Sequence, residues 1–405
     1  MATLSQSRLP RLVVLSVSLV CLFVSGSAHS GSSARQGRGN SELVVHEWGT
    51  FTSVAGPDGA AVKWHPRSGP SDLPSFVEHF RTADTKSEMQ GTVRMETPVL
   101  YFYSPAETTV SVKVGFSKGV ITEWYPHASH IEPNPKDILQ PSALYRQGRD
   151  GSIGWDSVTV EPGLTPHFPE EERESHYYAA RETSAAPVAV SAREGLQQEK
   201  FLFYRGISIF GLPITAQTTA DGRVLIKNLG QDEIASVILF ERRGDKMGYR
   251  LGGAVQNELR LDPPELTSTP EALGLDLQDA LMSQGLYADE ARAMVQTWKL
   301  SWFEEGSRVF YMVPVRFVDR VLPLSIKPAP SQTVRVFVGR MEVITPTTKQ
   351  DVAQALAHRD HELIAKYQRF IEPILDQLKS ENPARASEFD KELSDTYSIA
   401  AQGKR

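Results

Sequence analysis

The amino-acid sequence predicts a mainly β protein, β-sandwich-like with two sheets, with an inserted helical pair and C-terminal helices, so α+β overall. Three observations predict this class. Between residues 43 and 261, apolar side chains recur at every second position in many short segments. Between residues 269 and 303, they recur instead at the spacing of an amphipathic helix. After further strand-like segments between 308 and 344, helical spacing returns and continues toward the C-terminus.

Residues 1–28 have the pattern of a signal peptide. Arg8 and Arg11 precede the apolar run Leu12–Val24, and small residues follow up to Ala28. This run is shorter than the roughly 20 apolar residues that span a bilayer. We therefore expect cleavage near Ala28, a periplasmic or secreted location and no stable membrane span afterwards, with a retained anchor as the alternative. Residues 29–41 are rich in Gly, Ser and Arg and predict a flexible leader.

Composition excludes several classes of protein. Cys21 is the only cysteine, so the chain left after cleavage would have no disulfide, iron–sulfur cluster, thiolate zinc site or cysteine-attached haem. The formal net charge is -6, and no basic cluster interleaved with aromatic residues is present, which argues against nucleic acid as a partner. Phosphate-binding glycine motifs and the nucleophile elbow of serine hydrolases are also missing, so no nucleotide cofactor is expected.

The β-rich part is predicted over residues 42–262. In the segment TVSVKVGF, Val110, Val112, Val114 and Phe116 alternate with small or polar residues, as in a half-buried strand. The turn sequence SKG follows, and VITEW comes next, so we predict a hairpin in which Gly119 takes the unusual backbone angle.

The helical pair is predicted within residues 263–346. Thr269 is a suitable N-cap and Pro270 a suitable first residue for a helix in which Leu273, Leu277 and Leu281 share one face. A second helix is expected over residues 289–303. Strands then resume between 308 and 344, and the sequence leaves open whether they join the first sheet.

Residues 347–405 are predicted to be a C-terminal helical segment that packs back on the β-rich part. We expect one long helix from Thr347 to Lys379 and a shorter helix after Asn382-Pro383.

The segment VVHEWGTFTSV, residues 44–54, carries two adjacent polar residues in a strand-like context. Neighbouring side chains of a strand point to opposite faces, so His46 shares a face with Trp48, and Glu47 lies on the other. The two therefore cannot bind one ion, and the second histidine of a zinc-protease helix is replaced by Thr50. We expect a central strand in which His46 and Trp48 contact a ligand; a buried structural role is the alternative.

A divalent metal site is considered at a Pro-rich loop. His127 and His130 lie there with Glu123 and Glu132 nearby, and imidazole and carboxylate groups suit zinc, iron or manganese. Two histidines alone do not make a site, and an exposed polar loop is the alternative.

A second group of candidates lies at residues 176–182. His176 is a candidate acid or base, and Tyr177 and Arg181 are candidate ligand contacts because a guanidinium group binds carboxylates in a bidentate manner. Alternatively, Arg181 pairs with an acidic residue of the protein and the tyrosines pack.

Charges also occur within or beside apolar segments. Arg205 interrupts the apolar run FLFYRGISIF, where it needs either an ion-pair partner or a ligand anion, and Gly206 permits a bulge beside it. Glu305 is a candidate catalytic carboxylate at the junction of a helix and a strand, next to Glu304 and before Arg308.

These patterns leave three classes of function open, and they decide neither enzymatic activity nor oligomeric state. The favoured class is a ligand-binding or envelope-associated protein that holds a saccharide or peptide on an aromatic face. The alternatives are a hydrolase that uses metal or carboxylate chemistry and a structural component of the cell envelope. We expect Trp48, Trp64, Trp124 and Tyr177 to form this aromatic face.

Overall fold

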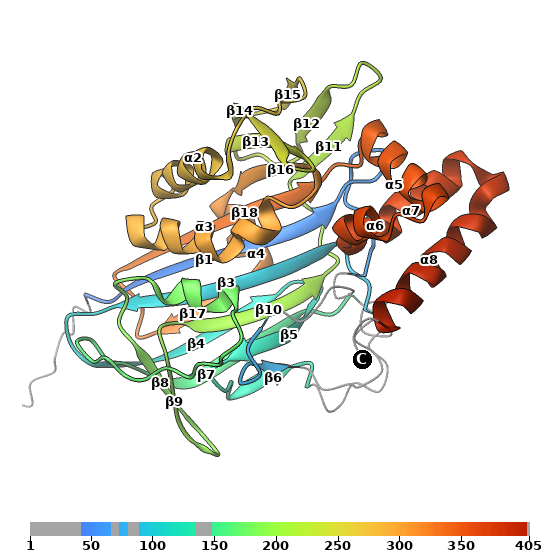
Figure 1. The fold of residues 1–405 in the computed structure, drawn as a ribbon. Coiled ribbons are helices and arrows are strands. Elements are labelled where there is room, and N and C mark those ends of the chain that lie inside the picture. The colour runs from blue at the N-terminus through green and yellow to red at the C-terminus, as the bar shows by residue number, and fades with distance from the viewer. Residues whose placement is uncertain (1–41, 66–72, 80–88, 135–147, 403–405) are drawn as a thin grey trace, which may run out of the picture. The chain divides into compact units, whose positions relative to one another are not determined.

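The largest sheet of the computed structural model has β1 at its centre (Figure 1). The model describes residues 42–65, 73–79, 89–134 and 148–402, so the predicted signal peptide and leader lie outside the described residues. β1 pairs in parallel with β18 and antiparallel with β3. The strand order of this nine-stranded sheet is β14 (Lys246–Val255), β13 (Ile234–Arg243), β16 (Gly306–Val313), β18 (Gln332–Glu342), β1 (Val44–Val54), β3 (Val93–Tyr103), β10 (Leu202–Ser208), β5 (Gly119–Tyr125) and β2 (Glu78–His79).

Two smaller sheets complete the β-rich part, so the mainly β, α+β class predicted from sequence is confirmed. A six-stranded sheet has the order β17 (Leu324–Lys327), β4 (Thr108–Phe116), β7 (Gly151–Val160), β8 (Val188–Ala192) and β9 (Gly195–Glu199), with β6 (His130–Glu132) paired to β7. A three-stranded sheet contains β11 (Ile214–Thr218), β12 (Val224–Asn228) and β15 (Glu258–Leu261).

The main core lies between the nine-stranded sheet and the two smaller sheets. Val45 and Phe51 of β1 pack in the same apolar cluster as Val112 of β4 and Ile226 of β12. This cluster forms because the alternation predicted from the sequence places one apolar row of each strand on the inner face of its sheet. Burying these rows is the main stabilising contribution to the fold.

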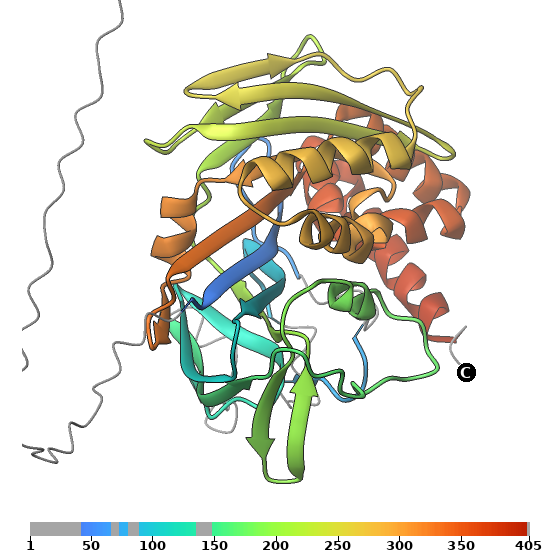
Figure 2. The same cartoon turned by 90° about the vertical axis from the view of Figure 1, so that its left-hand side faces the viewer.

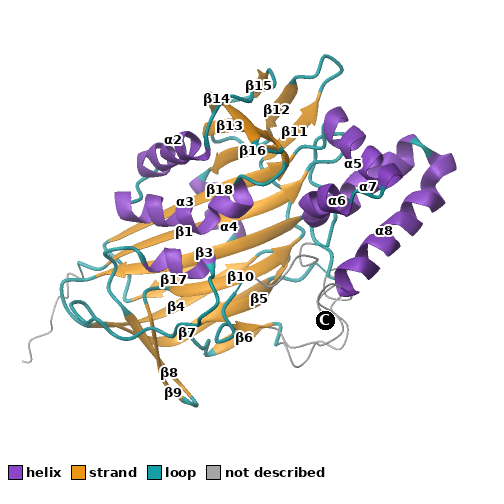
Figure 3. Ribbon diagram, in the orientation of Figure 1, coloured by secondary structure: helices purple, strands orange, loops and turns teal. Residues whose placement is uncertain are grey.

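The other face of the nine-stranded sheet is covered by helices, which Figure 3 shows in purple. α2 (Pro270–Ser283) and α3 (Ala288–Trp302) pack there on Trp48 and its neighbours, with the short helix η2 (His176–Arg181) beside α3. The predicted start of α2 is confirmed, since Thr269 accepts a hydrogen bond from the backbone N–H of Ala272 and Pro270 is the first helical residue. A further helix, α4 (Val315–Val321), follows β16.

The prediction of one long C-terminal helix is wrong, because the first helix of this segment ends at residue 358 and a new helix begins at residue 361. Arg359 adopts a left-handed backbone conformation, and the Asp360 carboxylate caps a new helix by accepting from the Leu363 N–H. The resulting helices pack on one another and on Val54 at the end of β1 (Figure 2). They are α5 (Pro346–His358), α6 (His361–Tyr367), η3 (Gln368–Phe370), α7 (Ile371–Glu381), η4 (Pro383–Arg385) and α8 (Ala386–Gln402).

The predicted hairpin at residues 110–124 is also wrong. β4 belongs to the six-stranded sheet and β5 to the nine-stranded sheet, so the turn carries the chain from one sheet to the other. Lys118, rather than Gly119, has the positive φ of 46°. Its N–H donates to the Asp150 carboxylate at 2.8 Å, a distant contact that local turn rules do not include.

The strands between residues 306 and 342 do not form a sheet of their own: β16 and β18 join the nine-stranded sheet, and β17 joins the six-stranded sheet. β16 and β18 lie between β13 and β1. Among the residues that the structure describes, no helix is long and apolar enough to cross a membrane.

Candidate functional site

A cavity of about 910 Å³ lies where β2 meets β5. It is lined by residues 75–79 and by residues of the turn between β8 and β9. Trp124 and Tyr125 at the end of β5 also line it, and so do His127 and His130 farther along the chain. Burial raises the pKa of Tyr125 to about 12, so its hydroxyl remains a hydrogen-bond donor at neutral pH. We call this space the Trp124 cavity.

Glu78 fixes the polar side of the Trp124 cavity. Its carboxylate accepts from the Trp124 indole N–H at 2.9 Å and pairs with His127 Nδ1 at 2.8 Å. His127 is 42% exposed, so its imidazole lies in the cavity wall and still reaches solvent. The wall at Ser75 is held by the Glu171 carboxylate, which accepts from both the hydroxyl and the N–H of Ser75 and has a lowered pKa for that reason.

The two candidate metal ligands line this cavity but have different partners. His127 pairs with Glu78, whereas His130 lies 3.6 Å from the Asp156 carboxylate on β7. No group of three or more His, Cys, Asp or Glu side chains within the described ranges is arranged to hold a metal ion. The structure thus brings His127 and His130 together in one cavity without giving them a third ligand from the described residues.

Arg181 binds a carboxylate of the protein itself. Its Nε and Nη2 donate to the two oxygens of Glu199 at 2.9 and 2.7 Å, and the Tyr177 hydroxyl donates to the same carboxylate at 3.1 Å. Glu199 is fully buried, which raises its pKa, and Arg181 opposes that shift. This is the pairing that the sequence left open as the alternative to ligand binding. His176, on the same short helix, packs against Trp298 of α3 with the two ring planes tilted by 35°.

His46 and Trp48 lie on the predicted face of β1, where α3 covers them. His46 Nδ1 pairs with the Glu290 carboxylate at 2.7 Å, and the Tyr103 hydroxyl donates to the same carboxylate at 2.8 Å. Both His46 and Trp48 are buried, at 1% and 0% exposure. Glu47, on the opposite face, accepts from Tyr204 and Arg335 inside the main core.

The four aromatic residues assigned to a ligand-binding face do not form one surface. Trp48 and Tyr177 belong to the apolar cluster under α2 and α3, Trp64 belongs to the C-terminal helical cluster, and Trp124 belongs to the main core. Of the four, Trp124 alone lines the Trp124 cavity.

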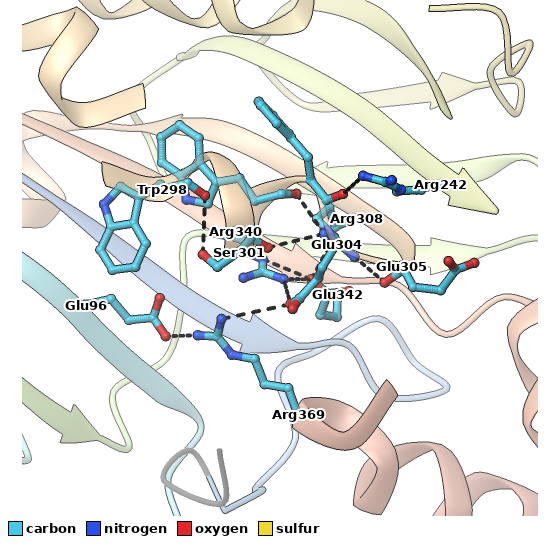
Figure 4. Close-up of polar contacts among 12 residues, drawn as sticks. Glu96, Arg242, Trp298, Ser301, Glu304, Glu305, Arg308, Arg340, Glu342 and Arg369 are labelled. Atoms are coloured by element: carbon cyan, nitrogen blue, oxygen red, sulfur yellow. Dashed lines mark hydrogen bonds and ion pairs between the residues drawn. The ribbon is translucent and has the colours of Figure 1, made fainter. Parts of the chain in front are cut away.

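Glu305 follows the end of α3, at the edge of a network of charged side chains that includes Glu304, and its own carboxylate points away from that network (Figure 4). The Glu305 carboxylate accepts from the Gly244 N–H at 3.0 Å and so holds the turn between β13 and β14. Glu304 instead pairs with Arg340 of β18 and lies 3.9 Å from Arg369.

Two arginines of this network have no exposed surface. Arg308 and Arg340 both pair with the Glu342 carboxylate at 2.9 Å, and Arg308 also donates to the backbone oxygen of Trp302 at 2.7 Å. Burial lowers the pKa of Arg308, and Glu342 counters that effect. Figure 4 shows the Arg369 guanidinium group between the carboxylates of Glu96 and Glu304.

Arg205 lies on the same face of the sheet, beside β3. The predicted bulge is confirmed, because the pairing of β10 with β5 shifts register between Arg205 and Gly206. Arg205 Nη2 donates to the Thr97 hydroxyl at 3.1 Å. Glu96 and Thr97 were not among the candidates from sequence, and neither were Arg340 and Glu342. Each is a polar residue inside an apolar strand, the signal that identified Arg205.

The candidates from sequence therefore have separate surroundings. His127 and His130 share the Trp124 cavity; His176, Tyr177 and Arg181 lie on η2 against α3 and Glu199; and Arg205 lies beside Thr97. The carboxylates of Glu78, Glu199 and Glu290 pair with His127, Arg181 and His46, respectively. Each carboxylate is distant in sequence from its partner, so no local sequence pattern predicts these pairs.

Comparison with known proteins identifies no family. No family model matches the chain, and no curated protein is similar to it. Among solved structures, the chain is similar to a yeast delta-COP-I mu-homology domain complexed with a Dsl1 WxWxV peptide, with 9% identity over 75% of this chain and 96% of that one. The TM-score is 0.26, which is too low to carry an argument about this chain.

Proposed function

We propose that this is an exported protein that binds a saccharide in the Trp124 cavity. The observation that carries the proposal is the cavity itself, which at about 910 Å³ falls in the size range of sites for small ligands. The proposal of export comes from the pattern of residues 1–28 alone.

The chemistry of the lining favours a sugar ring. Phe76 is partly exposed and packs edge-on against Tyr125, with ring centroids 4.9 Å apart, so it offers apolar surface at the cavity wall. Glu78 and His127 line the same cavity and supply an acceptor and an imidazole, and Arg193 of the turn between β8 and β9 supplies donors. Aromatic surface next to such groups suits a ligand that has apolar ring faces and hydroxyl edges.

The polar groups are already held in place before a ligand arrives. Glu78 is oriented by Trp124 and His127, and the His127 backbone N–H donates to the Gln197 side chain at 2.7 Å. Binding therefore requires little ordering of these side chains, which supports affinity.

The test is calorimetric titration of the protein lacking residues 1–28 with a panel of oligosaccharides and, in parallel, of short peptides. We expect a saccharide to bind, and both Phe76→Ala and His127→Gln to weaken binding about tenfold, the effect of losing one good contact. Leu251→Ala and His358→Gln are matched controls, because both residues are exposed and neither lines the cavity.

Three results would overturn the proposal: no saccharide binds, peptides bind in their place, or the two cavity variants bind saccharide as the wild type does. Export is tested separately, by expressing the full chain and sequencing the N-terminus of the product. We expect a mature chain that begins after Ala28; an intact N-terminus in the cytoplasm would contradict this part.

A further inference from the structure

A row of polar side chains crosses the helix-covered face of the nine-stranded sheet, between apolar clusters. It runs over four adjacent strands, and the pairing register places its members opposite one another: Thr52 faces Arg340, Thr50 faces Glu96 and Glu342 faces Arg308. We call this row the polar stripe; it consists of Arg308 on β16, Arg340 and Glu342 on β18, Thr50 and Thr52 on β1, and Glu96 and Thr97 on β3.

Helical residues border the polar stripe. Glu304, after the end of α3, pairs with Arg340, and Arg369 of η3 pairs with Glu96 (Figure 4). Glu304 is 25% exposed and Arg369 18%, so the stripe reaches solvent at this border, while Thr50, Thr52 and Arg340 are completely buried.

Four polar groups of the stripe lack a hydrogen-bond partner although they are buried. They are the hydroxyls of Thr50 and Thr52, the Oε2 atom of Glu96 and the Nη1 atom of Arg340. A buried group of this kind destabilises the fold when it stays unsatisfied, so native proteins keep few of them. Four in neighbouring register positions indicate that something polar satisfies them together.

The backbone is distorted at the same place. The β1–β3 pairing shifts register between Trp48 and Thr50, and the β3–β10 pairing shifts between Phe203 and Gly206. Thr97 has φ of 46°, a left-handed conformation that is costly for a β-branched residue. Bulges and strained residues concentrate near functional sites, where they direct side chains.

The donors and acceptors of the four groups decide what fits. Glu96 Oε2 only accepts when ionised, Arg340 Nη1 only donates, and a threonine hydroxyl does both. A carboxylate or phosphate would leave Glu96 facing another acceptor, and an ammonium group would leave Arg340 facing another donor. Hydroxyl groups complement all four, because each donates and accepts.

We propose that the polar stripe binds a small polyhydroxy molecule through these four groups. This site uses residues different from those of the Trp124 cavity, so the two proposals succeed or fail separately.

The test combines calorimetry and thermal denaturation of the protein lacking residues 1–28, with myo-inositol, D-ribose and D-glucose as probes. We expect at least one probe to bind and to raise the melting temperature. The double variant Thr50→Val, Thr52→Val keeps side-chain shape and removes both hydroxyls, so it should weaken binding about 10- to 100-fold.

Two controls locate the effect. Thr297→Val alters a buried threonine whose hydroxyl already donates to the Ala293 carbonyl, and it should leave probe binding unchanged. Leu251→Ala, at an exposed side chain of β14 that belongs to neither site, should also leave it unchanged.

Two outcomes would overturn the proposal. One is that no probe binds, which would mean that ordered water alone satisfies the four groups. The other is that a probe binds equally well to the Thr50→Val, Thr52→Val variant. Because this variant removes buried unpaired hydroxyls, we expect it to fold; a folded variant that binds normally would assign the probe to another site.

Discussion

Gly339 lies at the centre of β18, and replacing it by alanine tests how tightly the main core is packed. It pairs with Tyr311 of β16 on one side and with Phe51 of β1 on the other. The Tyr311 ring lies across the glycine, so that an added Cβ would come closer to ring atoms than the 3.0 Å that real Cβ atoms keep. Tyr311 is 1% exposed and is enclosed by the core, so the ring has little room to move away.

Overpacking of a close-packed core costs about 1–3 kcal/mol. We expect Gly339→Ala to lower the free energy of unfolding by about 2–3 kcal/mol, because the overlap is with a buried ring rather than with a flexible side chain. Equilibrium unfolding in guanidinium chloride, followed by tryptophan fluorescence, measures this as a lower midpoint with an unchanged denaturant slope.

A matched variant and a double-mutant cycle identify the cause. Gly211→Ala adds the same methyl group where nothing lies within 4 Å, so it should change stability by less than about 0.5 kcal/mol. In a Tyr311→Leu background, the cost of Gly339→Ala should fall by at least about 1 kcal/mol, since the overlapping ring is gone. An equal cost in both backgrounds, or a cost below about 0.5 kcal/mol in the wild type, would refute the overlap.

Three further predictions concern buried polar groups and core packing. Arg181→Leu leaves the Glu199 carboxylate buried without its cation and should lower the free energy of unfolding by about 3–5 kcal/mol near pH 7. Arg385→Ala breaks an exposed ion pair and should cost much less; denaturant unfolding measures both variants, and equal losses would contradict the burial argument. Burial raises the pKa of Glu199 in the folded state, so the stability that this group contributes is full below its ordinary pKa and is lost as pH rises through the raised pKa. Arg181 opposes this loss by stabilising the ionised carboxylate, so the stability lost in Arg181→Leu should grow from pH 4 to pH 7; a loss that does not depend on pH would contradict this. Leu281→Ala removes most of a buried side chain of α2 and should lower the free energy of unfolding by about 2–5 kcal/mol in the same measurement; a loss below about 1 kcal/mol would mean that α2 is not firmly packed.

Much of the secondary structure could be predicted from the sequence because it depends on local pattern. Alternation in TVSVKVGF predicted β4, and the Thr269-Pro270 start predicted α2, since N-capping and fixed backbone angles act over only a few residues. The strand at residues 44–54 was predicted with its two faces, and its central place in the largest sheet is confirmed.

Partners that lie far apart in the sequence could not be predicted. The end of the helix at Arg359 depends on the cap that Asp360 provides for the next helix, and the turn at Lys118 is held by the distant Asp150. Neither contact alters the period of the hydrophobic residues, so the sequence pattern does not indicate them. Arg181 could have held a ligand, and its acidic partner proved to be Glu199 on β9. Glu78 and Glu96 became candidate site residues only through pairing across strands.

The sequence by itself therefore determined which segments become strands or helices and which side chains of a strand share a face, because backbone geometry sets those periods. It also determined the signal-like N-terminus and the absence of cysteine chemistry after residue 28. The tertiary structure decided which strands are neighbours, which charges are paired and which polar groups remain buried without partners. Those outcomes depend on contacts between residues dozens to hundreds of positions apart, and no local pattern encodes them.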